Sequence, residues 1–177
     1  MTDNQSSNTL ENLILFEMKG KSHAIEIYDR ILWIIRTGYF TLFFGGWALI
    51  LQGFFDKDTS FENIKSILIG FCILSIFISI GGYLTDINYL KGKFRVINDL
   101  DKLIKWTLIN KATVSENEQL KEEDLKLLKN LLTNSGDSGT REYLTPGYKT
   151  AKKSILLLYA GSIISILLVV LLLRQIY

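Results

Sequence analysis

Two uncharged apolar stretches decide the fold of this chain: TGYFTLFFGGWALILQGFF at residues 37–55 and SILIGFCILSIFISIGGYLT at residues 66–85. Each is about 20 residues long, which is the length that an α-helix needs to cross about 30 Å of hydrocarbon. A core helix of a soluble protein would carry a charged face, and neither stretch contains a charged residue. A short polar segment, 56–65, separates them. We therefore expect two transmembrane helices joined as a hairpin.

A third apolar stretch, SILLLYAGSIISILLVVLLL, lies at residues 154–173. Hydrophobic residues make up 48% of the 177-residue chain, and they are grouped in blocks instead of being spread along amphipathic faces. The sequence therefore predicts an all-α membrane protein with three transmembrane helices. Its expected parts are an N-terminal cytoplasmic or interfacial amphipathic helix (1–36), a two-span transmembrane hairpin (37–86), a cytoplasmic helical region and linker (87–153) and a third, C-terminal transmembrane helix (154–173).

The segments that flank the spans carry helical patterns of their own. Apolar residues at helical spacing between Leu10 and Leu32 predict an amphipathic helix that leads directly into the first span, unless it breaks at Gly20. A similar stripe from Leu90 to Leu108 predicts that the second helix continues out of the bilayer.

A further helix is expected to start at Ser115, which forms a capping box with Glu118. Segment 134–139 should end this helix, and residues 145–147 (Thr-Pro-Gly) should form a turn before the third span. The leucines expected on one face of the helix are Leu120, Leu127, Leu128 and Leu131.

Charged residues outside the spans predict the orientation of the chain. The hairpin loop is net acidic, whereas basic residues follow the second span and precede the third. The positive-inside rule therefore places the N-terminus and residues 87–153 in the cytoplasm and the C-terminus outside. We expect the second basic group to contact anionic lipid headgroups. The two groups are Lys91, Lys93 and Arg95, and Lys149, Lys152 and Lys153.

One charged residue flanks each end of the hairpin, and both ends lie on the same side of the membrane. Arg36 precedes the first uncharged stretch and Asp86 follows the second, so both belong to the same leaflet. An arginine at the end of a span can extend its side chain to the interface, and a facing carboxylate lowers its cost further. We expect Arg36 and Asp86 to pair; the alternative is two charges that reach the interface independently.

Small and polar residues fall at helical spacing within the spans. They have two interpretations: they let helices pack closely in lipid, or they line a water-filled path. One chain has too few spans to enclose a pore, so a pore requires a homo-oligomer, and the face of the second span is the preferred lining. The candidates are Thr41, Gly45 and Gln52 on the first span and Cys72, Ser75, Ser79 and Gly82 on the second.

The residue types needed for catalysis are scarce in this chain. His23 is the one histidine and Cys72 the one cysteine, which excludes an intrachain disulfide, a histidine-based metal cluster and a histidine dyad. The sequence contains no Ser–His–Asp set, glycine fingerprint or polybasic tail. We therefore expect no enzyme activity, no cofactor, no metal site and no DNA-binding motif.

The overall plan resembles the SLATT class of small bacterial membrane effectors of antiphage defence. The likeness covers roughly residues 10–110 and lies in an N-terminal amphipathic helix, an aromatic-rich first span (YDRILWIIRTGYFTLFFGGW, 28–47) and a charged helix that leaves the second span. The third span departs from the two-span plan of that class. The resemblance implies an oligomeric pore-forming effector that perturbs the inner membrane when infection is sensed.

Two functions are compatible with these features. The first is a homo-oligomeric channel or membrane-perturbing effector, gated when a cytoplasmic protein or a nucleotide or nucleic-acid signal acts on residues 87–150. The second is a non-catalytic membrane anchor or adaptor that recruits a soluble partner through the helices of residues 90–132.

Overall fold

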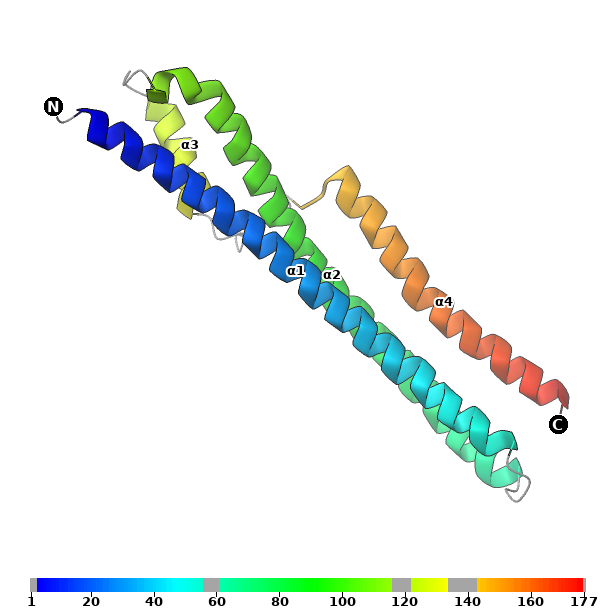
Figure 1. The fold of residues 1–177 in the computed structure, drawn as a ribbon. Helices are drawn as coiled ribbons and strands as arrows, with labels where there is room; N and C mark the ends of the chain where they lie inside the picture. The colour runs from blue at the N-terminus through cyan, green and yellow to red at the C-terminus, as the bar shows by residue number, and fades with distance from the viewer. Residues whose placement is uncertain (1–2, 56–60, 116–121, 134–142, 177) are drawn as a thin grey trace. The chain divides into compact units, whose positions relative to one another are not determined.

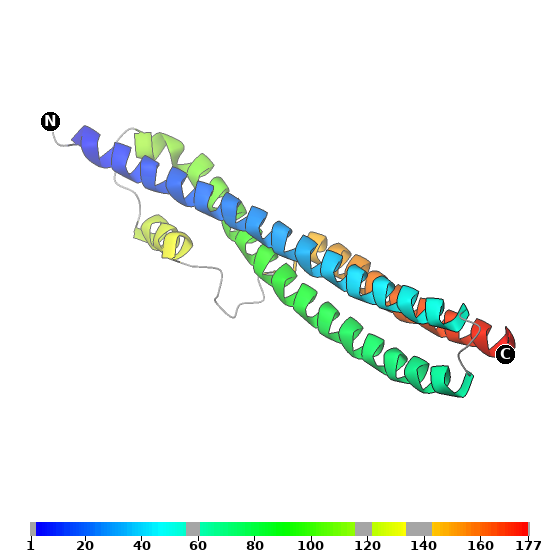
Figure 2. The ribbon, with the colours of Figure 1, turned by 60° about the horizontal axis from the view of Figure 1, so that its bottom comes forward.

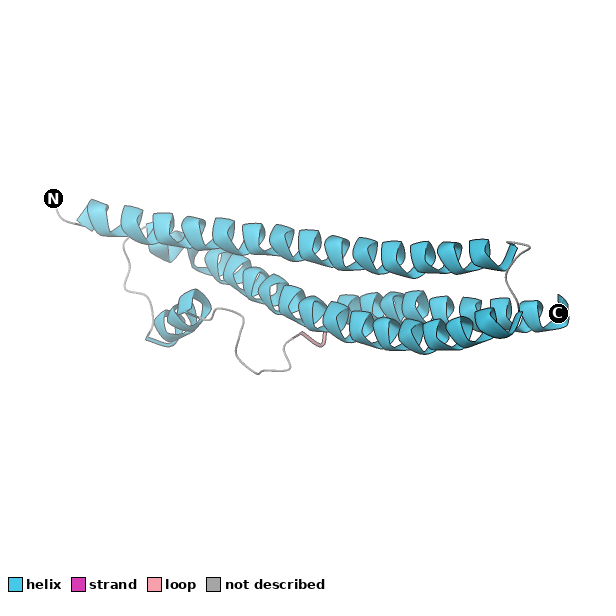
Figure 3. Ribbon diagram, turned by 90° about the horizontal axis from the view of Figure 1, so that it is seen from below, coloured by secondary structure: helices cyan, strands magenta, loops and turns pink. Residues whose placement is uncertain are grey.

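The computed structural model describes residues 3–55, 61–115, 122–133 and 143–176. All of these residues except 143–145 are helical (Figure 3). The helices are α1 (Asp3–Phe55), α2 (Phe61–Ser115), α3 (Glu122–Thr133) and α4 (Pro146–Ile176) (Figure 1).

Three of the described helices are long and apolar enough to cross a membrane. The candidate segments are Leu10–Gly53 in α1, Lys65–Asn110 in α2 and Pro146–Leu171 in α4. Large apolar side chains on them are exposed, among them Leu49 at 72%, Phe77 at 69% and Leu157 at 72%. Such surfaces match hydrocarbon and not water. The predicted all-α fold with three apolar, span-length helices is therefore confirmed.

Helices α1 and α2 are much longer than a span requires, at 53 and 55 residues. The predicted continuation of the second helix beyond its apolar stretch is confirmed, since α2 runs unbroken to Ser115. The break considered at Gly20 does not occur. A glycine costs a helix about 1 kcal/mol relative to alanine, which is too little to end one that continues on both sides.

The prediction of a helix start at Ser115 is wrong. Ser115 is the last residue of α2, and the next helix, α3, begins at Glu122. Glu118 and Leu120 lie outside the described residues. The apolar face of α3 is centred on Leu128 and Leu131, which are buried, whereas Leu127 is 47% exposed.

The turn expected at residues 145–147 is also wrong for its last two residues, because α4 begins at Pro146. The Tyr148 backbone N–H donates to Thr145 Oγ1 at 3.2 Å, so Thr145 caps the helix and Pro146 takes its first position. Proline suits that position because its missing N–H would have no partner in the helix.

The chain divides into two compact units. Unit 1 comprises Met1–Arg30 and Leu90–Tyr148, and unit 2 comprises Ile31–Tyr89 and Lys149–Tyr177. The core of unit 1 joins α1, α2 and α3, with Leu10, Met18 and Leu132 packed around it. Its buried residues are Ile14, Leu103, Trp106, Leu128 and Leu131.

Unit 2 contains the end of α1, the start of α2 and most of α4, which lie side by side (Figure 2). The α1 and α2 segments form the predicted antiparallel hairpin. Helix α4 runs parallel to α1, since Tyr39 contacts Tyr159, and further along both helices Trp47 and Ile166 line one pocket. Unit 2 therefore holds the predicted transmembrane segments and the residues considered next.

Candidate functional site

Arg36 of α1 and Asp86 of α2 form a bidentate ion pair in unit 2. The guanidinium donates from Nε to Asp86 Oδ2 at 2.8 Å and from Nη2 to Asp86 Oδ1 at 3.0 Å. The Asp86 side chain is fully buried, whereas that of Arg36 is 34% exposed. The structure thus brings together the two charges that the sequence assigned to one leaflet.

This pair fixes the register of α1 against α2. Burying a carboxylate costs several kcal/mol unless a well-placed cation and further hydrogen bonds compensate for it. The planar guanidinium matches both carboxylate oxygens at once, so a shift of one helix along the other would break both hydrogen bonds. The hairpin is therefore held at a defined alignment at this end of its spans.

A short hydroxyl chain, from Tyr39 through Ser79 to the Ser75 backbone, lies deeper in the span than the ion pair. The Ser79 hydroxyl donates to the Ser75 backbone oxygen at 2.8 Å, which leaves the Tyr39 hydroxyl to donate to Ser79 Oγ, also at 2.8 Å. Both serine side chains are 1% exposed. Because no water enters the hydrocarbon, these internal partners are what make the hydroxyls tolerable there.

Tyr159 of α4 covers this polar face of α2. Its ring lies 4.6 Å from that of Tyr39, and a Cβ on Gly82 would come within 2.8 Å of Tyr159 Cε1. Tyr159 is 2% exposed. Its buried hydroxyl lies near the Asp86 carboxylate, but within the described residues it makes no hydrogen bond of ordinary geometry. The absence of a side chain at Gly82 therefore leaves the space that the Tyr159 ring occupies.

The polar face of α2 is buried in the bundle, whereas the small and polar candidates on α1 are exposed. On α2, Ser75 and Ser79 are buried, Gly82 lies beneath Tyr159, and Cys72 is a half-buried free thiol. In the described part of the chain this face packs against α1 and α4. The candidates on α1 lie away from the buried Tyr39 and are exposed; they are Thr41, Gly45 and Gln52.

Sequence reasoning missed Tyr39 and Tyr159 as members of this site. Neither tyrosine is among the candidate residues drawn from the sequence. A signal was available, because a tyrosine hydroxyl inside an uncharged span needs a polar partner. The basic residues expected to meet lipid headgroups lie exposed near the start of α4; they are Lys149, Lys152 and Lys153.

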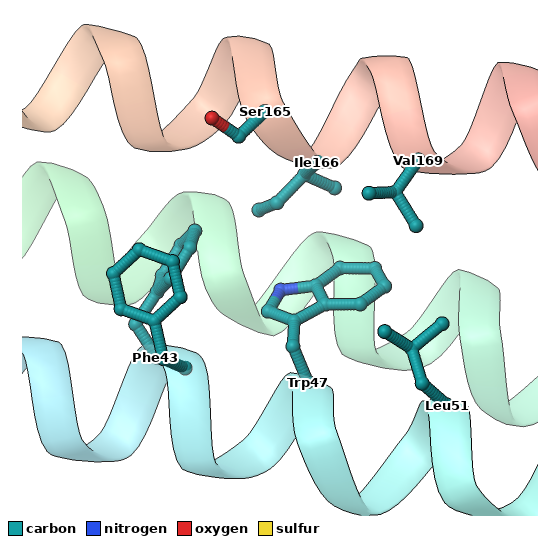
Figure 4. A pocket seen from close by; sticks show the side chains of 7 residues that line it. Phe43, Trp47, Leu51, Ser165, Ile166 and Val169 are labelled. Carbon is teal, nitrogen blue, oxygen red and sulfur yellow. The ribbon is translucent and has the colours of Figure 1, made fainter.

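An apolar pocket of about 130 Å³ lies between α1 and α4, further along the spans (Figure 4). The buried indole N–H of Trp47 at this pocket has no hydrogen-bond partner in the described segments of the chain. The pocket's lining residues are Phe43, Phe44, Trp47, Leu51, Ser165, Ile166 and Val169.

Within the described residues, no three His, Cys, Asp or Glu side chains gather as a metal site would require. The arrangement instead joins a buried ion pair, a hydroxyl chain and an aromatic cover inside an apolar bundle. No family model, curated protein or solved structure matches the chain significantly.

Proposed function

We propose that several copies of this chain form a channel or membrane-perturbing effector in the bacterial inner membrane, and that the conformation described above is closed. The observation that carries the proposal is the buried polar face of α2, formed by Ser75, Ser79 and Asp86. Polar and ionisable groups inside a membrane bundle are expensive, and they commonly mark a conduction path. Apolar packing would hold three helices together at lower cost.

Opening requires that Tyr39 and Tyr159 leave this face, because both rings now cover it. Hydroxyls and a carboxylate on one face of α2 would then line a path shared among copies. The small residues exposed on α1, such as Thr41 and Gly45, offer a surface on which neighbouring copies can pack closely.

The cytoplasmic helices are the proposed point of control. Helix α2 is continuous from the polar face to Ser115, so a displacement of its far end can be transmitted to the span. The signal would be a cytoplasmic protein, a nucleotide or a nucleic acid acting on residues 87–150. The role in antiviral defence rests on the resemblance to the SLATT class, and the cytoplasmic placement rests on the positive-inside rule.

Ion flux from liposomes tests the proposal. Reconstituted Tyr159→Ala protein should release a trapped potassium gradient at least tenfold faster than wild type, because the cover over Gly82 is lost. Adding Ser79→Leu should abolish that release by filling the path with an apolar side chain. Ser165→Leu is the matched control, since Ser165 makes the same backbone hydrogen bond, to Gly161 at 2.8 Å, on an exposed face. Ion-tight liposomes with Tyr159→Ala protein would contradict the proposal.

Exposed apolar side chains in unit 1 favour a second candidate, a membrane anchor or adaptor. Phe16 is 73% exposed, Leu108 70% and Ile109 79%. If these residues face the cytoplasm, they can dock a soluble partner. A stoichiometric partner that co-purifies with wild type but not with Phe16→Ser plus Ile109→Ser, together with ion-tight liposomes, would favour this candidate over the channel.

A further inference from the structure

The part of α2 that belongs to unit 1 starts at Leu90, and its first turns contact α1 and α4. Gly92 lies against the Tyr28 ring of α1, and Lys93 forms an ion pair with Asp29. Phe94 packs edge-on against Tyr148, with ring centroids 5.8 Å apart. The α2 side chains in these contacts therefore have clear structural partners.

Lys91 and Arg95 differ from these neighbours. Both lie over the ring of Tyr143, with Lys91 Nζ 5.8 Å and Arg95 Cζ 5.4 Å from its centroid. Within the described part of the chain, neither forms an ion pair with a carboxylate. Two like charges one helical turn apart repel each other, and an aromatic face offsets this only in part.

Arg95 also has a buried donor without an acceptor. Its Nε–H is shielded from solvent and has no hydrogen-bond partner among the residues that the structure describes. A cation over an aromatic face gains electrostatic energy, but the ring accepts no ordinary hydrogen bond from Nε. Buried donors are almost always paired, so this group calls for an acceptor that carries negative charge.

The distance of these residues from the uncharged span indicates where such an acceptor comes from. Asp86 ends that span, and Lys91 and Arg95 follow it on the same helix by five and nine residues. At 1.5 Å per residue they lie roughly 7 Å and 13 Å beyond Asp86 along the helix axis. The headgroup layer on each side of a bilayer is roughly 5–7 Å thick, so Lys91 lies at its outer edge and Arg95 roughly 6 Å beyond it. Helical side chains lean toward the N-terminus, which on α2 is the side of the span, so both long side chains extend back toward the lipid phosphates.

We propose that Lys91, Arg95 and Tyr143 form a binding site for a phosphate group, supplied by the headgroup of an anionic phospholipid. Arginine binds phosphate through two parallel N–H donors, and lysine adds a second positive charge. The Tyr143 ring forms cation–π contacts with both side chains. The site does not depend on the channel proposal, because an anchor would use it equally.

Occupation of this site would fasten the start of α4 to α2. Tyr143 packs edge-on against the buried Tyr148, with centroids 4.9 Å apart, and its backbone oxygen accepts the Thr145 N–H at 2.8 Å. Gly147 in turn lies against Phe94. A phosphate held by the two cations would therefore stabilise the turn that leads into α4.

Native mass spectrometry of the full chain in detergent tests this site, with phosphatidylglycerol and phosphatidylcholine as probes. Wild type should bind phosphatidylglycerol at least tenfold more tightly than phosphatidylcholine. Lys91→Gln plus Arg95→Gln should lower that preference, while any contribution of Lys149, Lys152 and Lys153 remains. Lys105→Gln plus Lys126→Gln removes the same charge from exposed lysines paired with Asp101 and Glu122, and should leave the preference unchanged. Circular dichroism establishes that each variant remains helical.

Inorganic phosphate distinguishes the two sources of the ligand. Failure of millimolar phosphate to displace phosphatidylglycerol supports a lipid site, whereas displacement at micromolar phosphate supports the phosphate site but overturns its assignment to lipid. An equal preference for phosphatidylglycerol in wild type and the Lys91/Arg95 variant would overturn the proposal. So would equal binding of the two lipids by wild type.

Discussion

At the scale of single residues, the ion pair of Arg36 and Asp86 is unequal. The carboxylate is fully buried, while the guanidinium keeps 34% of its side chain exposed. Removing the arginine leaves a buried carboxylate without a partner, whereas removing the aspartate leaves a cation that can extend to the interface. The two halves of one interaction should therefore differ in their cost.

We predict that Arg36→Gln lowers the free energy of unfolding by about 3–5 kcal/mol, which is the cost of leaving the buried Asp86 carboxylate without its cation. Asp86→Asn should cost about 1–2 kcal/mol, because the amide still accepts one hydrogen bond. Unfolding in mixed micelles, monitored by circular dichroism, measures both values. An Asp86→Asn variant as unstable as Arg36→Gln would show that the carboxylate is not the more buried partner.

The hydroxyl chain gives a second prediction at this scale. Ser79→Ala should destabilise the protein by about 1–3 kcal/mol, because it leaves the buried Tyr39 hydroxyl without an acceptor. Adding Tyr39→Phe should recover part of that loss, since both hydroxyls are then absent. Ser165→Ala, at an exposed serine, should be close to neutral in the same unfolding measurement. No difference between the two serines would argue against the hydroxyl chain.

At the scale of helices, the packing of α4 on α2 depends on adjacent glycines with different surroundings. A Cβ on Gly82 would lie 2.8 Å from Tyr159 Cε1, whereas a Cβ on Gly81 would meet nothing within 4 Å. Gly82→Ala should therefore displace the Tyr159 ring and cost about 1–3 kcal/mol. Gly81→Ala should be neutral or stabilise α2 by up to about 1 kcal/mol. Thermal unfolding of both variants checks this, and equal melting temperatures would contradict the seating of Tyr159 on Gly82.

The sequence predicted elements better than it predicted their ends and partners. Apolar blocks of span length are enough to identify three helices, because lipid demands internal backbone pairing. Helix ends were predicted less well. Ser115 carries a capping pattern but is the last residue of α2, and Pro146 suits a helix start as well as a turn. Tyr159 could not be matched to Gly82, because that contact depends on how α4 packs, which no local pattern specifies.

At the scale of the whole molecule, the central claim is that the polar face of α2 is covered when the protein is closed and meets water when it opens. Most large side chains exposed on the spans are apolar, as Leu49 illustrates at 72% exposure, so this outer surface suits contact with lipid. Water can therefore reach Ser79 only along a path that opens inside the membrane.

Thiol accessibility tests this claim most directly. Ser79→Cys in a Cys72→Ala background should resist a charged, membrane-impermeant thiol reagent, and should react with it when Tyr159→Ala is added. Leu49→Cys, on the lipid-facing surface, should stay unreactive with and without Tyr159→Ala. If Ser79→Cys remains as protected as Leu49→Cys after Tyr159 is removed, no water path follows this face of α2 and the channel account is contradicted.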